Sequence, residues 1–170
     1  MGASLVRIED AAENAWIHSQ VNTGNGPHWW IGLVASTTDE THEWNDCPGE
    51  PAHYTNWMAG EPNNHTDEGC VKMEYDSGAW NDVPCSKTLN FICEKRLTEE
   101  TRCSSWKYKY NKCGTEVDRT IRDLCVLKQR SKAECAWGIS YLLSTNDPNN
   151  PDDTKFSVDD GCRADFRVYF

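Results

Sequence analysis

The sequence contains two short stretches rich in carboxylate and amide oxygens, Gly60-Glu61-Pro62-Asn63-Asn64 and Trp80-Asn81-Asp82-Val83-Pro84-Cys85. A further carboxylate, Glu68, lies between them. Calcium prefers such oxygens and takes roughly six to eight of them. The same residue types are also common as solvated turn formers. The spacing alone therefore leaves both a calcium site and an ordinary set of turns open.

The segment before these clusters predicts a short strand and one helix. Residues 4–8 have the pattern of a strand. Asp10 is a candidate N-cap, and Glu13 follows three residues later, as in a capping box. Apolar residues then recur at helical spacing: Ala12, Trp16, Ile17 and Val21. We therefore expect an amphipathic helix over residues 11–21, ended by the turn formers at 24–27.

The middle of the first half is expected to be mostly irregular. Residues 29–33, 71–75 and 90–94 have the composition or alternation of strands. Between about residue 34 and residue 82 the chain is rich in turn formers and poor in periodicity. Long irregular regions inside compact domains are usually functional or disordered. Several tryptophans in this region, Trp44, Trp57 and Trp80, favour an ordered, functional region.

The nine cysteines indicate disulfides formed in an oxidising compartment. There is no Cys-x-x-Cys pair, and all five histidines precede residue 66. The half richest in cysteine therefore lacks the imidazoles of a Cys/His zinc site, so zinc is the weaker interpretation. Because the count is odd, at least one cysteine has no partner within this chain.

Charge is distributed unevenly along the chain. Residues 1–96 contain 15 Asp and Glu against 5 Lys and Arg, whereas residues 97–170 contain 12 of each, so the net charge of −10 belongs to the first part. This balance argues against nucleic acid and anionic membranes as partners. It fits cation binding, although a solvated acidic face is the plainer alternative.

The termini and hydropathy bear on localisation. No secretory signal precedes the first strand, and no apolar run is long enough to cross a membrane. The cysteine pattern predicts a secreted or extracellular protein without membrane insertion. An exported type of cysteine pattern without an export signal suggests a fragment or a truncated gene model.

The second part of the chain is expected to be a separate small unit. Residues 97–102 are polar and aperiodic, which indicates a linker before a unit at 103–170. Residues 144–153 form a loop rich in Pro, Asn and Asp. The end of the chain has a period-two strand pattern, with these residues on one face: Cys162, Ala164, Phe166, Val168 and Phe170.

The first part of the chain contains a series of short motifs whose order can be compared with those of known protein families. They are Gly2-Ala3-Ser4-Leu5-Val6-Arg7-Ile8, Glu13-Asn14-Ala15, Trp30-Ile31-Gly32-Leu33, Tyr54-Thr55-Asn56-Trp57, residues 60–64, Glu68 before Cys70, residues 80–85 and Phe91-Ile92-Cys93-Glu94. On these residues the chain resembles the C-type lectin family, and most closely its mannose-type members. The resemblance implies an α+β fold: mixed β-structure with a flanking helix and a long irregular calcium-binding loop region, over residues 1–96. Relative to the family pattern, the N-terminal strands and first helix are missing.

The resemblance also implies a calcium site and its ligands. The residues that match the family's ligands are Glu61, Asn63, Glu68, Asn81 and Asp82. Two vicinal sugar hydroxyls would complete the coordination, so the same residues would contact the carbohydrate, with His65 beside them. A cis peptide before Pro62 is implied as well. The Glu-Pro-Asn order resembles that of members that bind mannose, fucose, glucose and N-acetylglucosamine, and an auxiliary calcium site of some members looks lost.

The family pattern assigns some of the cysteines and a modification site. Cys70 and Cys85 match its inner disulfide. Cys93 matches one half of its outer disulfide, whose other half would precede Met1, so Cys93 is expected to be free. Cys47 is additional to the pattern. The sequon Asn64-His65-Thr66 makes Asn64 a candidate for N-glycosylation, although many sequons are unused.

The second unit resembles, more weakly, a small cysteine-rich domain of unknown function found in bacteria and invertebrates. The matching features are residues 127–131, Cys135 with Trp137-Gly138, and residues 160–166. The resemblance implies a small β-rich fold with two disulfides among four cysteines: Cys103, Cys113, Cys135 and Cys162. Their connectivity stays open. Residues 107–110 are interpreted as a strand face, with glycan contact as the alternative.

Three function classes follow from these observations. The first is a calcium-dependent carbohydrate-binding module. The second is a protein- or mineral-binding module of the same fold that does not bind sugar. The third is an enzyme, which we disfavour because carboxylates neutralised by calcium are poor general acids and no Ser/His/Asp or reactive Cys/His arrangement is evident. The sequence gives no coiled coil and no oligomeric state.

Overall fold

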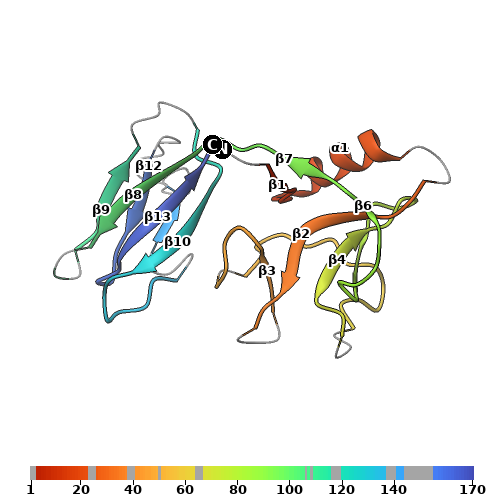
Figure 1. Ribbon diagram of the computed structural model, residues 1–170. Helices are drawn as coiled ribbons and strands as arrows, with labels where there is room; N and C mark the ends of the chain where they lie inside the picture. The colour runs from red at the N-terminus through yellow and green to blue at the C-terminus, as the bar shows by residue number, and fades with distance from the viewer. Residues whose placement is uncertain are drawn as a thin grey trace. The chain divides into compact units, whose positions relative to one another are not determined.

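The chain divides into two compact units in a computed structural model, Met1–Lys95 and Arg96–Phe170 (Figure 1). The structure describes residues 3–22, 26–37, 41–49, 51–63, 67–105, 107, 109–115, 120–136, 141–143 and 155–170. Each unit has its own strands and its own buried core, so each is described separately.

The first unit combines one helix with two sheets. In chain order its elements are β1 (Ser4–Leu5), α1 (Ala11–Val21), β2 (Trp29–Ala35), β3 (His42–Trp44), β4 (Cys70–Met73), β5 (Trp80–Val83), β6 (Asn90–Phe91) and β7 (Cys93–Glu94). The larger sheet has the order β3-β2-β4-β5, and β6 pairs with β2 in parallel. The small sheet pairs β1 with β7, antiparallel.

Helix α1 occupies the residues that the sequence predicts. The Asp10 carboxylate accepts a hydrogen bond from the Glu13 backbone N–H at 2.8 Å, which satisfies a donor that the helix leaves open. The Glu13 side chain reaches back and accepts from the Glu9 N–H, also at 2.8 Å. This reciprocal pair resembles a capping box, shifted by one residue on the return bond.

Trp80 forms the centre of the first core. Its side chain is fully buried, and the rings of Trp44, Tyr54 and Trp57 contact it edge-on at 6.0, 5.6 and 6.1 Å between centroids. Its indole N–H donates to the Asn14 side chain at 2.8 Å, and the Asn14 amide donates to the Gly78 carbonyl. Helix α1 is therefore tied to β5, which fixes where β5 places its polar residues.

The long region expected to be irregular contains more strand than the sequence predicts. Strands β3 and β5 were not expected, and Asn81 and Asp82 lie on β5 rather than in a loop. The reason is that β5 is too short and too polar to show alternation. Trp80 and Asp82, an apolar and an acidic residue, are both fully buried, so burial along the strand does not follow hydrophobicity.

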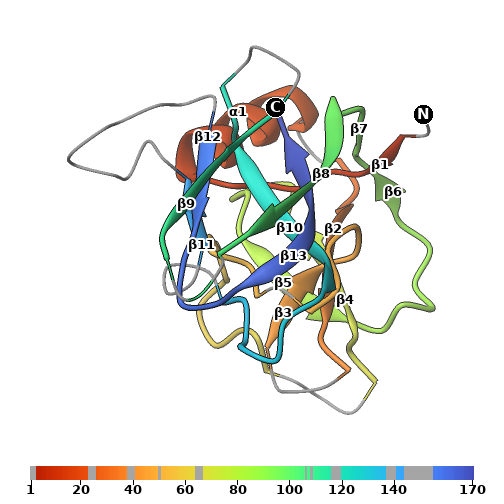
Figure 2. The ribbon, with the colours of Figure 1, turned by 90° about the vertical axis from the view of Figure 1, so that its left-hand side faces the viewer.

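Within its described residues, the second unit contains two antiparallel three-stranded sheets. Its strands are β8 (Thr98–Ser104), β9 (Asn111–Gly114), β10 (Asp123–Gln129), β11 (Tyr141–Leu143), β12 (Lys155–Val158) and β13 (Arg163–Tyr169). Figure 2 views this unit face on, with β13 between β8 and β10. The other sheet has the order β11-β12-β9.

The two sheets of the second unit share one core. The Phe166 ring on β13 contacts Tyr141 on β11 and Phe156 on β12, with centroids 5.3 and 5.0 Å apart. The predicted inward face of the last strand is confirmed, since four of its members are completely buried: Cys162, Ala164, Phe166 and Val168. Phe170, the fifth, is partly buried against the same core.

The expected linker over residues 97–102 is wrong. These residues run into β8, which pairs with β13 along its whole length. The strand lacks apolar alternation because ionic pairs join it to its neighbour. Arg102 lies opposite Asp165, and Glu100 lies opposite Arg167, with side-chain contacts of 2.9 and 3.2 Å. Opposite charges across a ladder stabilise it as apolar pairs do.

Three disulfides have defined partners. Cys70 bonds Cys85, as the family resemblance implies, while Cys103 bonds Cys113 and Cys135 bonds Cys162. Cys47 and Cys125 are also disulfide-bonded. Cys93 is the free cysteine and is exposed. Within the described parts of the chain, no helix has the length and hydropathy to cross a membrane.

Candidate metal centre

Strand β5 places Asp82 at the centre of the candidate site. Asp82 pairs with Val71 of β4 in the ladder, and its side chain is completely buried. A buried carboxylate is costly unless hydrogen bonds or a cation compensate it. The position therefore calls for specific partners.

A loop runs beside β5 and brings Glu61 and Asn63 to Asp82. The Trp80 N–H donates to the Asn56 carbonyl at 2.7 Å, and the Met58 N–H donates to the Trp80 carbonyl at 2.8 Å. The Glu61 N–H then donates to the Met58 carbonyl at 3.0 Å, which turns the chain back. Gly60 adopts φ +90°, a conformation that glycine tolerates best.

The Glu-Pro-Asn segment has the backbone form that the resemblance implies. The peptide bond between Glu61 and Pro62 is cis. The Asn63 N–H is shared between two carboxylates: it donates to Glu61 Oε2 at 3.0 Å and to Asp82 Oδ1 at 3.2 Å. One backbone donor therefore joins the two clusters that the sequence separates.

Glu68 lies within electrostatic range of Glu61. It lies two residues before Cys70, whose disulfide to Cys85 ties the start of β4 to the segment after β5. Its Oε2 oxygen is buried and has no hydrogen-bond partner among the described residues. An unpartnered buried carboxylate oxygen is rare in folded proteins and marks a place where a ligand would be stabilised.

The electrostatics of Glu61 reflect these neighbours. Burial raises the pKa of the Glu61 carboxyl most, followed by its hydrogen bond to Asp82 and the negative charges of Asp82 and Glu68. The Asn63 N–H acts in the opposite direction. Like charges disfavour ionisation, whereas a nearby cation would favour it. The arrangement thus gains stability from a cation, and its donors are all oxygens, the chemistry that suits calcium.

His42 is a neighbour of this region that the sequence did not single out. It is buried on β3, and its ring contacts Trp57 edge-on at 4.7 Å. Burial lowers the pKa of His42, and the charge of Asp82 partly offsets this effect. No motif includes His42, which the structure places on β3 beside β2.

The predicted ligands differ in how far the structure unites them. Glu61, Asn63, Glu68 and Asp82 come together, whereas Asn81 is half-buried on β5 and is placed only as the neighbour of Asp82. The predicted sugar contact and glycosylation site, at residues 65 and 64, lie outside the described residues. In the described ranges, no three Asp, Glu, His or Cys side chains are already gathered as a metal cage.

Comparisons with known proteins point to one family. The model of the Lectin C-type domain matches residues 1–95. C-type lectin lectoxin-Enh4 of Pseudoferania polylepis is 41% identical over 98 residues, which are 56% of this chain and 60% of that protein. CD209 antigen-like protein D of Mus musculus is 38% identical over 99 residues, which cover 58% of this chain and 40% of that protein. The chain thus spans less than two thirds of these relatives.

Solved structures were compared as well. A structure of the mouse scavenger receptor C-type lectin carbohydrate-recognition domain aligns with a TM-score of 0.48 and 40% identity, over 55% of this chain and 69% of that one.

Proposed function

Because the chain belongs to the C-type lectin domain family, we propose that its first unit binds carbohydrate through one calcium ion. The ion would be held by side-chain oxygens of five residues: Glu61, Asn63, Glu68, Asn81 and Asp82. C-type lectins are generally binding proteins rather than enzymes, and the proposal assigns no catalytic residue. The relatives are longer than the part matched here, so the proposal concerns this unit alone.

One observation gives the strongest support for a bound calcium ion. The buried Glu68 Oε2 oxygen has no hydrogen-bond partner in the described part of the chain, and the charge of Glu68 acts on Glu61. The negative charges of Asp82 and Glu68 both disfavour ionisation of Glu61, and a divalent cation bound among them would convert that repulsion into attraction. Calcium supplies the charge and accepts irregular oxygen coordination.

The sugar would bind to the calcium ion directly. Each of two vicinal hydroxyls would give the ion a lone pair and form hydrogen bonds with the ligands on either side. Glu61 and Glu68 accept only, whereas the amides of Asn63 and Asn81 also donate. The order Glu-Pro-Asn favours hydroxyl pairs such as the 3- and 4-hydroxyls of mannose, fucose, glucose or N-acetylglucosamine. Hydrogen bonds to ionised groups are roughly twice as strong as neutral ones, which supports selectivity from a shallow site.

The setting of this activity would be outside the cell. Paired cysteines are stable in oxidising compartments, and disulfide-rich lectin relatives are typically secreted or extracellular. The partner would be a glycan of the mannose class. Single sites of this kind bind weakly, so useful avidity would come from several copies presented together.

The test is a pair of titrations on the whole chain. Calorimetry should detect one calcium ion per chain, and thermal unfolding of the first unit should shift upward with calcium. Mannose should then bind in calcium and fail to bind after calcium is removed, with galactose as the matched weaker sugar. Calcium binding without any sugar would favour a protein- or mineral-binding module. The absence of calcium binding would refute the proposal.

A further inference from the structure

The second unit contains a pocket with a positive rim. Its volume is about 380 Å³, and three cationic side chains line it: Lys107, Lys132 and Arg163. The rest of the lining is small and uncharged, with Ser105, Ser131 and Gly161 among its members. No acidic residue is part of this lining in the described chain. The pocket therefore has the composition of an anion-binding site, whereas the candidate site of the first unit is acidic.

Three turns that are far apart in the sequence build the pocket, around Ser105, Ser131 and Gly161. The hydroxyl groups of the two serines join their turns to the third. The Ser105 hydroxyl donates to the Lys109 carbonyl at 2.8 Å and accepts from the Gly161 N–H at 3.3 Å. The Ser131 hydroxyl donates to the Ala133 carbonyl at 2.7 Å and accepts from the Arg163 N–H at 3.1 Å. The serines therefore fix the framework.

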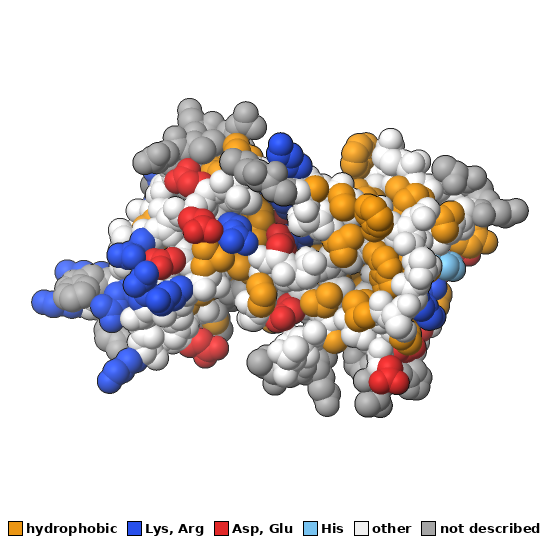
Figure 3. Space-filling model, in the orientation of Figure 1, with side chains coloured by type: hydrophobic (Ala, Val, Ile, Leu, Met, Phe, Trp, Pro, Cys, Tyr) orange, Lys and Arg blue, Asp and Glu red, His pale blue; other side chains and the backbone are white. Residues whose placement is uncertain are grey.

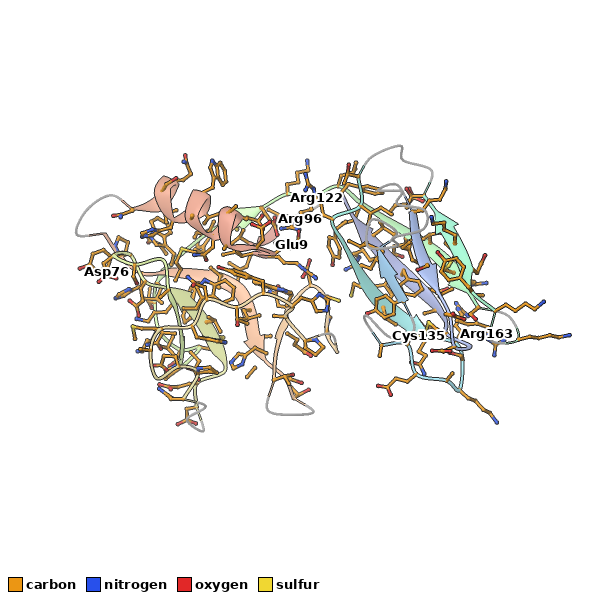
Figure 4. The ribbon with its side chains drawn as sticks, turned by 180° about the vertical axis from the view of Figure 1, so that it is seen from behind. Glu9, Asp76, Arg96, Arg122, Cys135 and Arg163 are labelled. Atoms are coloured by element: carbon orange, nitrogen blue, oxygen red, sulfur yellow. A yellow bond between two sulfur atoms is a disulfide. The ribbon has the colours of Figure 1, made fainter. Side chains whose placement is uncertain are left out.

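Covalent and backbone bonds hold the third turn in place. The disulfide between Cys135 and Cys162 joins it to the turn after β10. The Ser105 N–H donates to the Cys162 carbonyl at 2.7 Å, and the Arg130 N–H donates to the Arg163 carbonyl at 2.7 Å. Figure 4 places Cys135 and Arg163 together at one end of this unit. A site on so constrained a frame loses little conformational entropy when a ligand binds.

The cations differ in how they are held. Lys107 and Lys132 are exposed, whereas Arg163 is half-buried at the start of β13. Lys107 has φ +57°, in the left-handed region. The nearby carboxylate of Asp165 is engaged by Arg130 and Arg102. Figure 3 shows Lys and Arg side chains gathered over this end of the unit.

We propose that this pocket binds a sulfate or phosphate ester carried by a molecule of monosaccharide size. The ammonium groups of Lys107 and Lys132 would contact the oxyanion, and Arg163 in the same lining would add to the positive potential. A water molecule occupies roughly 30 Å³ in the liquid. A pocket of about 380 Å³ therefore holds more than an oxyanion, which leaves room for its carrier.

Charge balance favours a small anion over a polyanion. The unit Arg96–Phe170 contains 12 acidic and 13 basic residues, so its net charge is only +1. Nucleic acids and anionic membranes are bound through broad positive surfaces. One local cluster of cations on a nearly neutral unit suits a single ester group. The proposal is independent of the calcium site and concerns a different unit.

The test compares galactose 6-sulfate, galactose 6-phosphate, inorganic sulfate and galactose by calorimetry on the whole chain. Calcium is removed with a chelating resin, because soluble chelators are themselves anions, and galactose is the sugar class that the first unit disfavours. Either ester should bind while galactose should not. Binding of inorganic sulfate as tight as that of the esters would show that the carrier contributes nothing, which would overturn the carrier part of the proposal. If neither ester binds, the site itself is refuted.

Two double variants distinguish binding in the pocket from non-specific attraction by the positive charges of the unit. Lys107→Asn with Lys132→Gln removes two pocket cations, and asparagine tolerates the left-handed backbone at residue 107. Affinity should fall about tenfold or more. The control, Lys128→Gln with Lys155→Gln, removes equal charge from exposed positions outside the pocket lining and should change affinity less than about twofold. Equal losses would overturn the proposal. The single variant Lys132→Gln, in an exposed turn, repeats the test if the double variant folds poorly.

Discussion

Carboxylates are arranged differently in the two units. Asp165 on β13 lies between two guanidinium groups: Arg102 Nε donates to Oδ1 at 2.9 Å, and Arg130 Nε donates to the same oxygen at 2.8 Å. The hydrogen bonds from Arg130 and Arg102 hold the pKa of Asp165 well below its usual range. Burial and the neighbouring carboxylates instead raise the pKa of Glu61 in the first unit.

This difference separates a structural carboxylate from one that awaits a ligand. Asp165 has its cations within the chain and stabilises the pairing of its strand. Glu61 has Asp82 and Glu68 as the carboxylates that perturb it, and under the proposed function a calcium ion from solution would compensate their charge. Opposite pKa shifts on chemically similar groups thus point to different roles.

The strongest test of this contrast is Glu68→Gln. The change keeps the size of the side chain and removes one charge from the calcium ligands. Calcium affinity should fall on the order of 100-fold, because ligand charge sets affinity in such sites. Without calcium the variant should be as stable as the native protein or more stable, because a repulsion has been removed. Calorimetry and thermal unfolding measure the two effects.

Glu74→Gln is the matched control for that variant. Glu74 is buried, and Lys72 Nζ contacts its Oε1 at 2.7 Å, so this carboxylate already has a cation. Its loss should lower the free energy of unfolding by roughly 1–3 kcal/mol and leave calcium affinity unchanged. If both variants behave alike, the distinction between paired and ligand-seeking carboxylates fails.

Lowering the pH should weaken calcium binding by the first unit, whereas it should increase the contribution of Glu61 to the stability of the calcium-free unit. Calcium requires ionised ligands, and each pH unit below the raised pKa of Glu61 should weaken binding about tenfold for one proton. Without calcium, a folded-state pKa above the unfolded one means that protonation of Glu61 favours the folded state. The contribution of Glu61 to calcium-free stability should therefore improve as the pH falls through its raised pKa. Calcium titrations at several pH values measure the first effect, and denaturant unfolding without calcium measures the second. Glu61→Gln is the control for both. An affinity that does not change with pH would contradict it.

Sugar selectivity should follow the two residues around Pro62. Glu61→Gln with Asn63→Asp keeps an oxygen ligand on each side and the same net charge, but it exchanges the hydrogen-bond donor with the acceptor. An unpaired polar group in the site costs roughly 1–3 kcal/mol, which corresponds to a shift in preference of about tenfold or more. Competition between mannose and galactose measures the shift. If the double variant binds calcium and keeps its preference, the mannose assignment is wrong.

Local signals gave much of the fold in advance. Asp10 and Glu13 predicted where α1 begins, and the alternation after Cys162 predicted the buried face of β13. These features depend on a few residues that are neighbours in the sequence, so the sequence alone predicts them. The cis peptide before Pro62 came from the family resemblance rather than from a local signal, and the structure confirms it.

The remaining features depend on contacts between distant segments. Strand β8 looked like a linker because its partners are charged residues of β13 rather than apolar ones. The position of His42 on β3, which pairs with β2, was likewise not signalled by any motif. The pocket of the second unit needs three turns, around Ser105, Ser131 and Gly161, that only the folded sheets bring together. No single stretch of sequence contains such an arrangement.

The smallest expected effect concerns the Asp165 ion pairs. A folded-state pKa below the unfolded value means that the stabilisation is present above the unfolded pKa of aspartate, roughly 3.9, and is lost as the pH falls below it. Asp165→Asn should therefore lower the midpoint of denaturant unfolding of the second unit slightly at pH 7. The difference between variant and native protein should shrink at pH 3, because the native carboxylate is then partly protonated once the chain unfolds. Exposed pairs contribute little, so the change should be far smaller than any at the calcium ligands. Asp160→Asn is the control, because in the described part of the chain no guanidinium group contacts the Asp160 carboxylate. A larger loss for Asp165→Asn at pH 3 than at pH 7 would reverse the expected sign and would remove Asp165 as the structural counterpart of Glu61.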